Sequence, residues 1–112
     1  MHKITQTGEG VYDIILTRGD TLTLTVGMKV NGQSYTPTTG SIRFAMKKTY
    51  SDETCVLEKT IPLNSLTLVI EPTDTKTLPM DSKYVFDIQY TDQTGNIDTF
   101  IEGTFRIDHE VD

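Results

Sequence analysis

The residues that could carry chemistry are few and lie mostly near the ends of the chain. His2 and His109 are both terminal, and neither has a second histidine nearby. Segment 108–112 places Asp108, Glu110 and Asp112 around His109, and this mixture of nitrogen and carboxylate ligands could hold a cation loosely. Because a flexible end pre-organises ligands poorly, we interpret the segment as a solvated tail and predict no metal site.

A second group of oxygen ligands lies in segment 92–98. Asp92, Asn96 and Asp98 superficially suggest a calcium loop. Their spacing lacks the alternating acidic residues and the closing glutamate of an EF-hand. We therefore interpret them as residues of a hairpin turn.

Cys55 is the only cysteine, so no internal disulfide can form. No histidine or basic residue lies near it in the sequence. It is therefore interpreted as a small buried or half-buried hydrophobe rather than as a reactive thiol.

The string Arg18-Gly19-Asp20 has the composition of an integrin-binding motif. Gly19 also suits a tight turn, and a threonine-rich alternating segment follows directly. We therefore predict a turn at Gly19, with Asp20 at the start of a strand.

Catalytic motifs are missing from the sequence. Catalysis requires a nucleophile beside a base, or paired carboxylates in a cleft. The sequence contains no Gly-x-Ser-x-Gly, phosphate-binding loop or His-Glu-x-x-His. We predict that the protein is not an enzyme and has no cofactor.

Charge and length restrict the class further. The 112 residues suffice for one domain, and ten Lys and Arg against sixteen Asp and Glu give a net charge of -6. This charge repels a phosphate backbone, so nucleic-acid binding is not expected. The N-terminus lacks an apolar signal-peptide region, and no run is long enough to span a membrane. We expect synthesis in the cytoplasm, a flexible arm over residues 1–10, one domain over 11–108 and a tail over 109–112.

Two alternating segments, 84–90 and 97–107, are the strongest structural signal. Their β-branched and aromatic residues recur with a period of two, which predicts two half-buried strands. The turn-rich segment 92–95 between them predicts a hairpin with a four-residue loop. The expected register sets Tyr90 against Ile97, Ile88 against Thr99, Phe86 against Ile101 and Tyr84 against Gly103.

Shorter alternating segments complete an all-β, antiparallel sandwich of seven to eight strands. The further strands are expected at 11–16, 21–26, 42–47, 55–61 and 66–70, with 33–36 as an eighth. Segment 55–61 is expected at a sheet edge, with Lys59 discouraging further pairing. One short helical turn is expected near residues 73–78, with Thr73 as its cap and Pro79 preventing its continuation.

Segment 78–86 resembles the corner before strand F of immunoglobulin-like domains. Tyr84 matches the tyrosine that in those domains bonds back to the upstream backbone, and Phe86 stands where antibody domains place a cysteine. The resemblance implies a disulfide-free immunoglobulin-like sandwich. An ordinary strand aromatic that covers Gly103 is the alternative for Tyr84.

A second resemblance covers nearly the whole chain. Four strings in this order look like small immunoglobulin-like domains of tailed-phage and prophage structural proteins: 18–21, 73–79, 84–89 with 91–92 and Gly95, and 102–107 with 110–111. They are similar, more loosely, to the N-terminal domain of phage baseplate upper proteins. The resemblance implies a non-enzymatic structural or assembly module of the virion, associated with the tail or baseplate. Its partners would be other virion subunits, a second copy, or a host-surface glycan or receptor.

Four hydrophobic or aromatic residues are candidates for an interface. In the expected register Phe100 lies on the polar face of the hairpin, opposite Asp87. If neighbouring strands add Val85, Val69 or Ile15 to that face, the patch is large enough for a subunit contact; an isolated exposed aromatic is the alternative.

Tyr35 and Tyr50 are expected in loops, where an aromatic ring could contact a partner or a glycan. A carbohydrate- or receptor-binding module is therefore the alternative function. A cellular adhesin is a third hypothesis, which the missing signal peptide disfavours.

Overall fold

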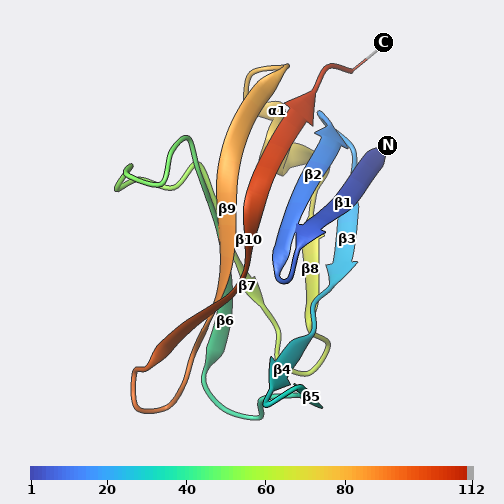
Figure 1. Ribbon diagram of the computed structural model, residues 1–112. Coiled ribbons are helices and arrows are strands. Elements are labelled where there is room, and N and C mark those ends of the chain that lie inside the picture. Colours follow the sequence, from blue (N-terminus) through green and yellow to red (C-terminus); the bar gives the residue numbers. More distant parts are fainter. Residues whose placement is uncertain (111–112) are drawn as a thin grey trace.

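The alternating segments form strands of an all-β sandwich in the computed structural model, which describes residues 1–110 (Figure 1). Ten strands and one short helix are found in these residues, against seven to eight strands expected; β1 and β4 are the additions. The elements are β1 (His2–Gly8), β2 (Val11–Thr17), β3 (Leu22–Thr25), β4 (Met28–Val30), β5 (Gln33–Tyr35), β6 (Ser41–Lys47), β7 (Leu57–Ile61), β8 (Thr67–Ile70), α1 (Pro72–Lys76), β9 (Ser82–Thr91) and β10 (Ile97–Asp108).

The two layers of the sandwich are very unequal. One layer is a six-stranded sheet in the order β1-β2-β10-β9-β6-β7, and the other is the pair β3-β8, with the β4-β5 hairpin following β3. All strand pairs are antiparallel except β2 and β10, which run parallel. The expected edge position of segment 55–61 is confirmed, because β7 ends the sheet.

The core lies between these layers and consists of the alternating apolar residues. Burial of one face of each strand explains the period of two in the sequence. Phe44, Phe86 and Phe105 form its centre on the adjacent strands β6, β9 and β10. The buried residues around them include Ile14, Leu16, Leu22, Ile42, Met46, Ile61, Leu68, Ile70, Tyr84, Ile88 and Ile107.

The expected register of the β9-β10 hairpin is wrong. Ile97 pairs with Thr91, and a β-bulge between Thr99 and Ile101 then shifts the pairing, so that Ile101 faces Ile88 and Gly103 faces Phe86. Beyond the bulge the shift from the expected register is two residues, and the same side chains therefore still face the core.

The chemistry of the hairpin loop explains part of this shift. One oxygen of the Asp92 carboxylate accepts hydrogen bonds from the backbone N–H groups of Thr94 (2.9 Å) and Asn96 (3.0 Å). The loop therefore includes Asn96 and is one residue longer than expected. Hydrogen bonding from Thr94 and Asn96 also lowers the pKa of Asp92. The interpretation of this segment as turn chemistry rather than a calcium loop fits these contacts.

The N-terminal segment forms a strand rather than the expected flexible arm. β1 pairs along its length with β2, with Lys3 opposite Ile15 and Thr5 opposite Asp13. All seven residues of β1 are exposed, so the strand lacks the alternation by which the other strands can be recognised. Its position is determined by backbone pairing, which leaves little trace in the sequence.

The short helix lies close to where the sequence predicts it, at Pro72–Lys76, but its cap is different. Glu71, not Thr73, is the N-cap residue, and its backbone N–H donates to the Asp74 carboxylate at 2.7 Å. Pro72 occupies the first helical position, where its missing N–H costs nothing.

Tyr84 is buried, as a core aromatic would be, at 3% exposure. Within residues 1–110 its hydroxyl makes no hydrogen bond to the upstream backbone. It pairs with Phe105, and Gly103 lies opposite Phe86 instead. The described residues therefore show no hydrogen bond from Tyr84 of the kind found at an immunoglobulin-like corner. The alternative interpretation, in which Tyr84 covers Gly103, is not found either.

Candidate functional site

A groove of about 580 Å³ opens between the two layers, along the edges formed by β1 and β3. It exists because the two-stranded layer is too narrow to cover the inner face of the six-stranded sheet. The volume lies within the range of ordinary ligand sites. The lining combines apolar side chains, among them Ile4, Leu24, Phe100 and Ile101, with polar ones such as Gln6 and Lys29.

Phe100 lines this groove, and its expected place on the polar face of the hairpin is therefore wrong. It is the extra residue in the β-bulge of β10, and it is half-buried against the core. A bulge redirects the side chain of its extra residue. The aromatic residue predicted to lie outside thus contributes to the apolar wall of a cleft.

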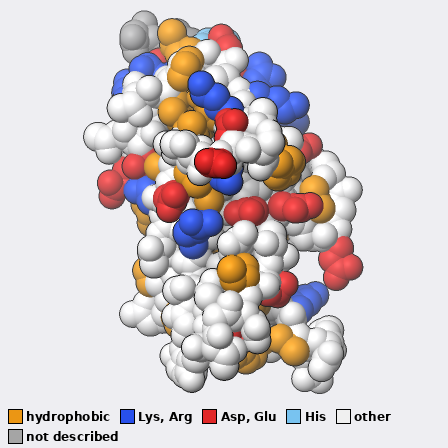
Figure 2. Space-filling model, turned by 90° about the vertical axis from the view of Figure 1, so that its left-hand side faces the viewer, with side chains coloured by type: hydrophobic (Ala, Val, Ile, Leu, Met, Phe, Trp, Pro, Cys, Tyr) orange, Lys and Arg blue, Asp and Glu red, His pale blue; other side chains and the backbone are white. Residues whose placement is uncertain are grey.

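The other members of the expected patch lie apart from Phe100. Val85 is half-buried on β9, between Lys47 of β6 and Thr104 of β10. Val69 belongs to β8, in the opposite layer of the sandwich. Figure 2 shows one side of the molecule, where charged side chains of both signs are interspersed with scattered hydrophobic atoms. The combination of Phe100, Val85 and Val69 therefore does not form one surface.

The exposed tyrosines also lie apart. Tyr35 is 42% exposed on β5, and Tyr50 is 63% exposed in the loop between β6 and β7. Figure 1 shows the β4-β5 hairpin and this loop toward opposite ends of the molecule. Tyr50 borders a small hollow with Arg43, Asp87 and Gln89. Partial burial, and then the charges of Glu102 and Asp87, raise the pKa of Tyr50.

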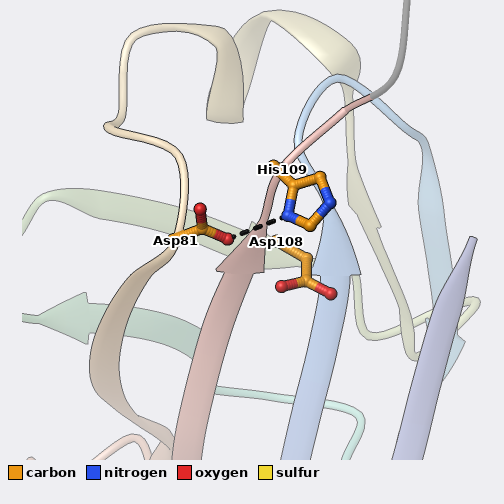
Figure 3. A group of neighbouring side chains, drawn as sticks. All are labelled: Asp81, Asp108 and His109. Atoms are coloured by element: carbon orange, nitrogen blue, oxygen red, sulfur yellow. Dashed lines mark hydrogen bonds and ion pairs between the residues drawn. The ribbon is translucent and has the colours of Figure 1, made fainter.

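Three possible metal ligands meet near the end of β10 (Figure 3). Asp81, Asp108 and His109 place one ligand atom each within 4.8 Å of one another. His109 Nδ1 lies 3.1 Å from the Asp81 carboxylate, and Asp108 lies 3.2 Å from the guanidinium of Arg106. Hydrogen bonding from His109 lowers the pKa of Asp81. The carboxylates are thus already paired with cationic or hydrogen-bonding groups of the chain itself.

In the sequence Asp108 and His109 stand next to Glu110 and Asp112, whereas Asp81 comes from the turn before β9. Only spatial proximity could reveal it. Asp112 of the expected group lies outside the described residues, and Glu110 turns toward a different cluster.

Glu110 joins the Arg18 turn to α1. Its carboxylate lies 2.5 Å from the guanidinium of Arg18 and 2.8 Å from the ammonium of Lys76. Arg18 also donates to the backbone oxygens of Lys76 and Leu78 at the end of the helix. Gly19 adopts a positive φ of 86°, and its N–H donates to the hydroxyl of Thr75. The predicted turn is confirmed, and Arg18 is committed to the helix rather than displayed for a receptor.

The Glu110 contacts predict a pH-dependent stability. Lys76, and then Arg18, lower the pKa of Glu110 below its usual value. Because the folded-state pKa lies below the unfolded one, the contribution of Glu110 is complete above the unfolded value of about 4.3 and is lost as the pH falls through the folded value. Glu110→Gln should therefore lose less stability than the wild type between about pH 6 and about pH 3 in urea unfolding.

Glu53→Gln is the control, because Glu53 is exposed in the loop after β6. This variant should keep the pH dependence of the wild type. Identical pH dependence in Glu110→Gln and the wild type would contradict the role of the cluster.

Cys55 is half-buried, in agreement with its interpretation as a small hydrophobe. Burial, and then a hydrogen bond with Glu58, raise the pKa of its thiol. A raised pKa lowers the thiolate fraction, and with it the nucleophilicity at neutral pH.

No protein-family model matches the chain, and no curated protein matches its sequence. The likeness to phage sandwich domains therefore rests on the sequence segments alone. Within residues 1–110, no helix combines the length and the hydrophobicity that crossing a membrane requires.

Proposed function

We propose that the protein is a non-enzymatic structural or assembly module that works through protein–protein contacts. The observation that carries this proposal is the open groove between the layers, with apolar residues of both sheets in its lining. An apolar surface left open beside a polar rim is typical of a site that another protein covers.

The order of the segments that resemble phage and prophage sandwich domains supports a more specific proposal. The protein would be made in the host cytoplasm and incorporated into the virion, at the tail or baseplate. Other virion subunits would be its partners. Mass spectrometry of purified particles tests this location, and its absence from them would contradict the proposal.

Size-exclusion chromatography with light scattering tests the contact itself. The protein is mixed with the products of the genes that flank its own, and we expect co-elution with at least one of them. Ile4→Asp should weaken this complex, because Ile4 lines the groove. Val69→Asp is a matched control, since both side chains are 39% exposed but Val69 lies on the other layer. A strict monomer that joins no particle component would contradict the proposed function.

A carbohydrate- or receptor-binding module is the second candidate. Tyr50 favours it, since an exposed ring beside Arg43, Asp87 and Gln89 offers stacking and hydrogen bonds to one ligand. Tyr35 lies elsewhere and would form a separate site. Binding on a glycan array that Tyr50→Ala abolishes would support this candidate, and a silent array would argue against it.

A further inference from the structure

One edge of the six-stranded sheet leaves a row of backbone groups without partners among residues 1–110. The N–H of Thr17 donates to the oxygen of Met1 at 2.9 Å, which makes these two residues a hydrogen-bonded pair. Bonded pairs alternate in an antiparallel ladder, so Lys3 and Thr5 also bond to β2. The N–H and C=O groups of His2, Ile4 and Gln6 therefore point away from the sheet.

The opposite edge of the same six-stranded sheet, β7, is protected in a way that β1 is not. On β7, the Lys59 ammonium lies 2.7 Å from the Asp74 carboxylate of α1, so a charged side chain and the helix stand beside that edge. Charges and covering elements of this kind discourage further pairing. In β1, Ile4 and Gln6 line the groove and are uncharged, whereas Lys3 alternates with them and lies on the opposite face of the strand. The strand contains no proline.

The free edge and the groove share the same residues. Ile4 and Gln6 offer backbone donors and acceptors, and their side chains line the groove. Outward N–H and C=O groups that recur at every second residue can form hydrogen bonds with another strand, because the backbone of a strand has the same repeat. A strand added there would direct every second side chain into the groove.

We propose that β1 binds an extended segment of a partner protein as an added strand. Alternate apolar side chains of this segment fill the groove, and its remaining side chains include Lys or Arg. The net charge of -6 favours a basic segment and opposes a second copy of the chain. This inference rests on the proposed function in requiring a protein partner.

A designed peptide tests the proposal directly. The probe is a fluorescein-labelled peptide of nine residues that alternates valine and threonine between two terminal lysines, titrated against the full chain by fluorescence anisotropy. We expect saturable binding. Gln6→Pro should weaken it at least about tenfold, because the ring removes an outward N–H and obstructs the edge. Gln6→Ala keeps the N–H and should bind within about twofold of the wild type.

Hydrogen exchange provides a readout that requires no variant. Adding the peptide should slow exchange at Ile4 and Gln6, whereas Lys3 and Thr5 are already bonded to β2 and should change little. Proline is tolerated where the N–H of an edge strand faces solvent, so circular dichroism should show Gln6→Pro folded.

Three results would overturn the inference: no saturable binding, equal affinity of Gln6→Pro and Gln6→Ala, or a homodimer that Gln6→Pro dissociates. A particle component that co-elutes equally with the wild type and Gln6→Pro would overturn the edge site and leave the proposed function standing. If no component co-elutes although the peptide binds, the proposed function fails and the edge site stands.

Discussion

Gly103→Ala is expected to lower the free energy of unfolding by at least about 3 kcal/mol, or to prevent folding. A Cβ at this position would lie 1.7 Å from the backbone oxygen of Tyr12 and 2.8 Å from its carbonyl carbon. Both atoms belong to β2, whose parallel pairing with β10 places Tyr12 opposite Gly103. Backbone in the middle of a six-stranded sheet cannot move aside as a flexible side chain can.

Urea unfolding followed by far-UV circular dichroism measures this effect. Gly27→Ala is the matched control, because Gly27 is exposed and an added Cβ there would meet no atom within 4 Å. The control should remain within about 0.5 kcal/mol of the wild type. Wild-type stability of Gly103→Ala would mean that β2 and β10 are not paired as closely as described, and the parallel pairing would be wrong.

The parts of the fold that could be predicted are those in which burial acts on every second residue. The inner faces of β9 and β10 are examples, because Ile88 and Phe105 stand between polar residues and are buried. Local turn chemistry is equally informative at Gly19, and the Asn31-Gly32 pair between β4 and β5 is a turn signal of the same kind. In both cases the residues that favour the turn are the residues that form it.

The features that the sequence does not reveal depend on distant contacts. β1 has no buried face, so nothing in its residue pattern distinguishes it from a flexible arm. The parallel pairing of β2 with β10 joins residues that are about 90 positions apart in the chain. The register of the hairpin depends on the Asp92 carboxylate and on the bulge at Phe100. The alternation of apolar residues in the sequence indicates neither feature.

The candidate site could not be predicted for the same reason. The groove exists because only β3 and β8 face the larger sheet, and the width of a layer is not a local property. Phe100 is expected from the sequence on the polar face opposite Asp87, but the bulge turns it into the groove instead. The assignment of Val85, Tyr35 and Tyr50 to an interface remains a prediction.

Phe105→Ala is the second large expected effect, at about 3–5 kcal/mol of lost stability. Phe105 is fully buried, and its ring centroid lies 6.2 Å from those of Phe44 and Phe86. The Phe86 and Phe105 rings meet at 90°, an edge-to-face geometry that adds to the effect of burial alone. The three rings come from neighbouring strands, so the cavity would weaken β6, β9 and β10 together.

Phe100→Ala, measured by the same urea unfolding, compares the loss of stability at a groove residue with the loss at a core residue. Phe100 is only half-buried, and the groove beside it is open, so its truncation enlarges an existing cleft rather than creating a cavity. We expect a loss of about 1–2 kcal/mol, clearly below that of Phe105→Ala. Equal losses in the two variants would mean that Phe100 is packed as tightly as the core. The wall of the groove would then be closed to any partner, which would argue against the binding site at β1 as well.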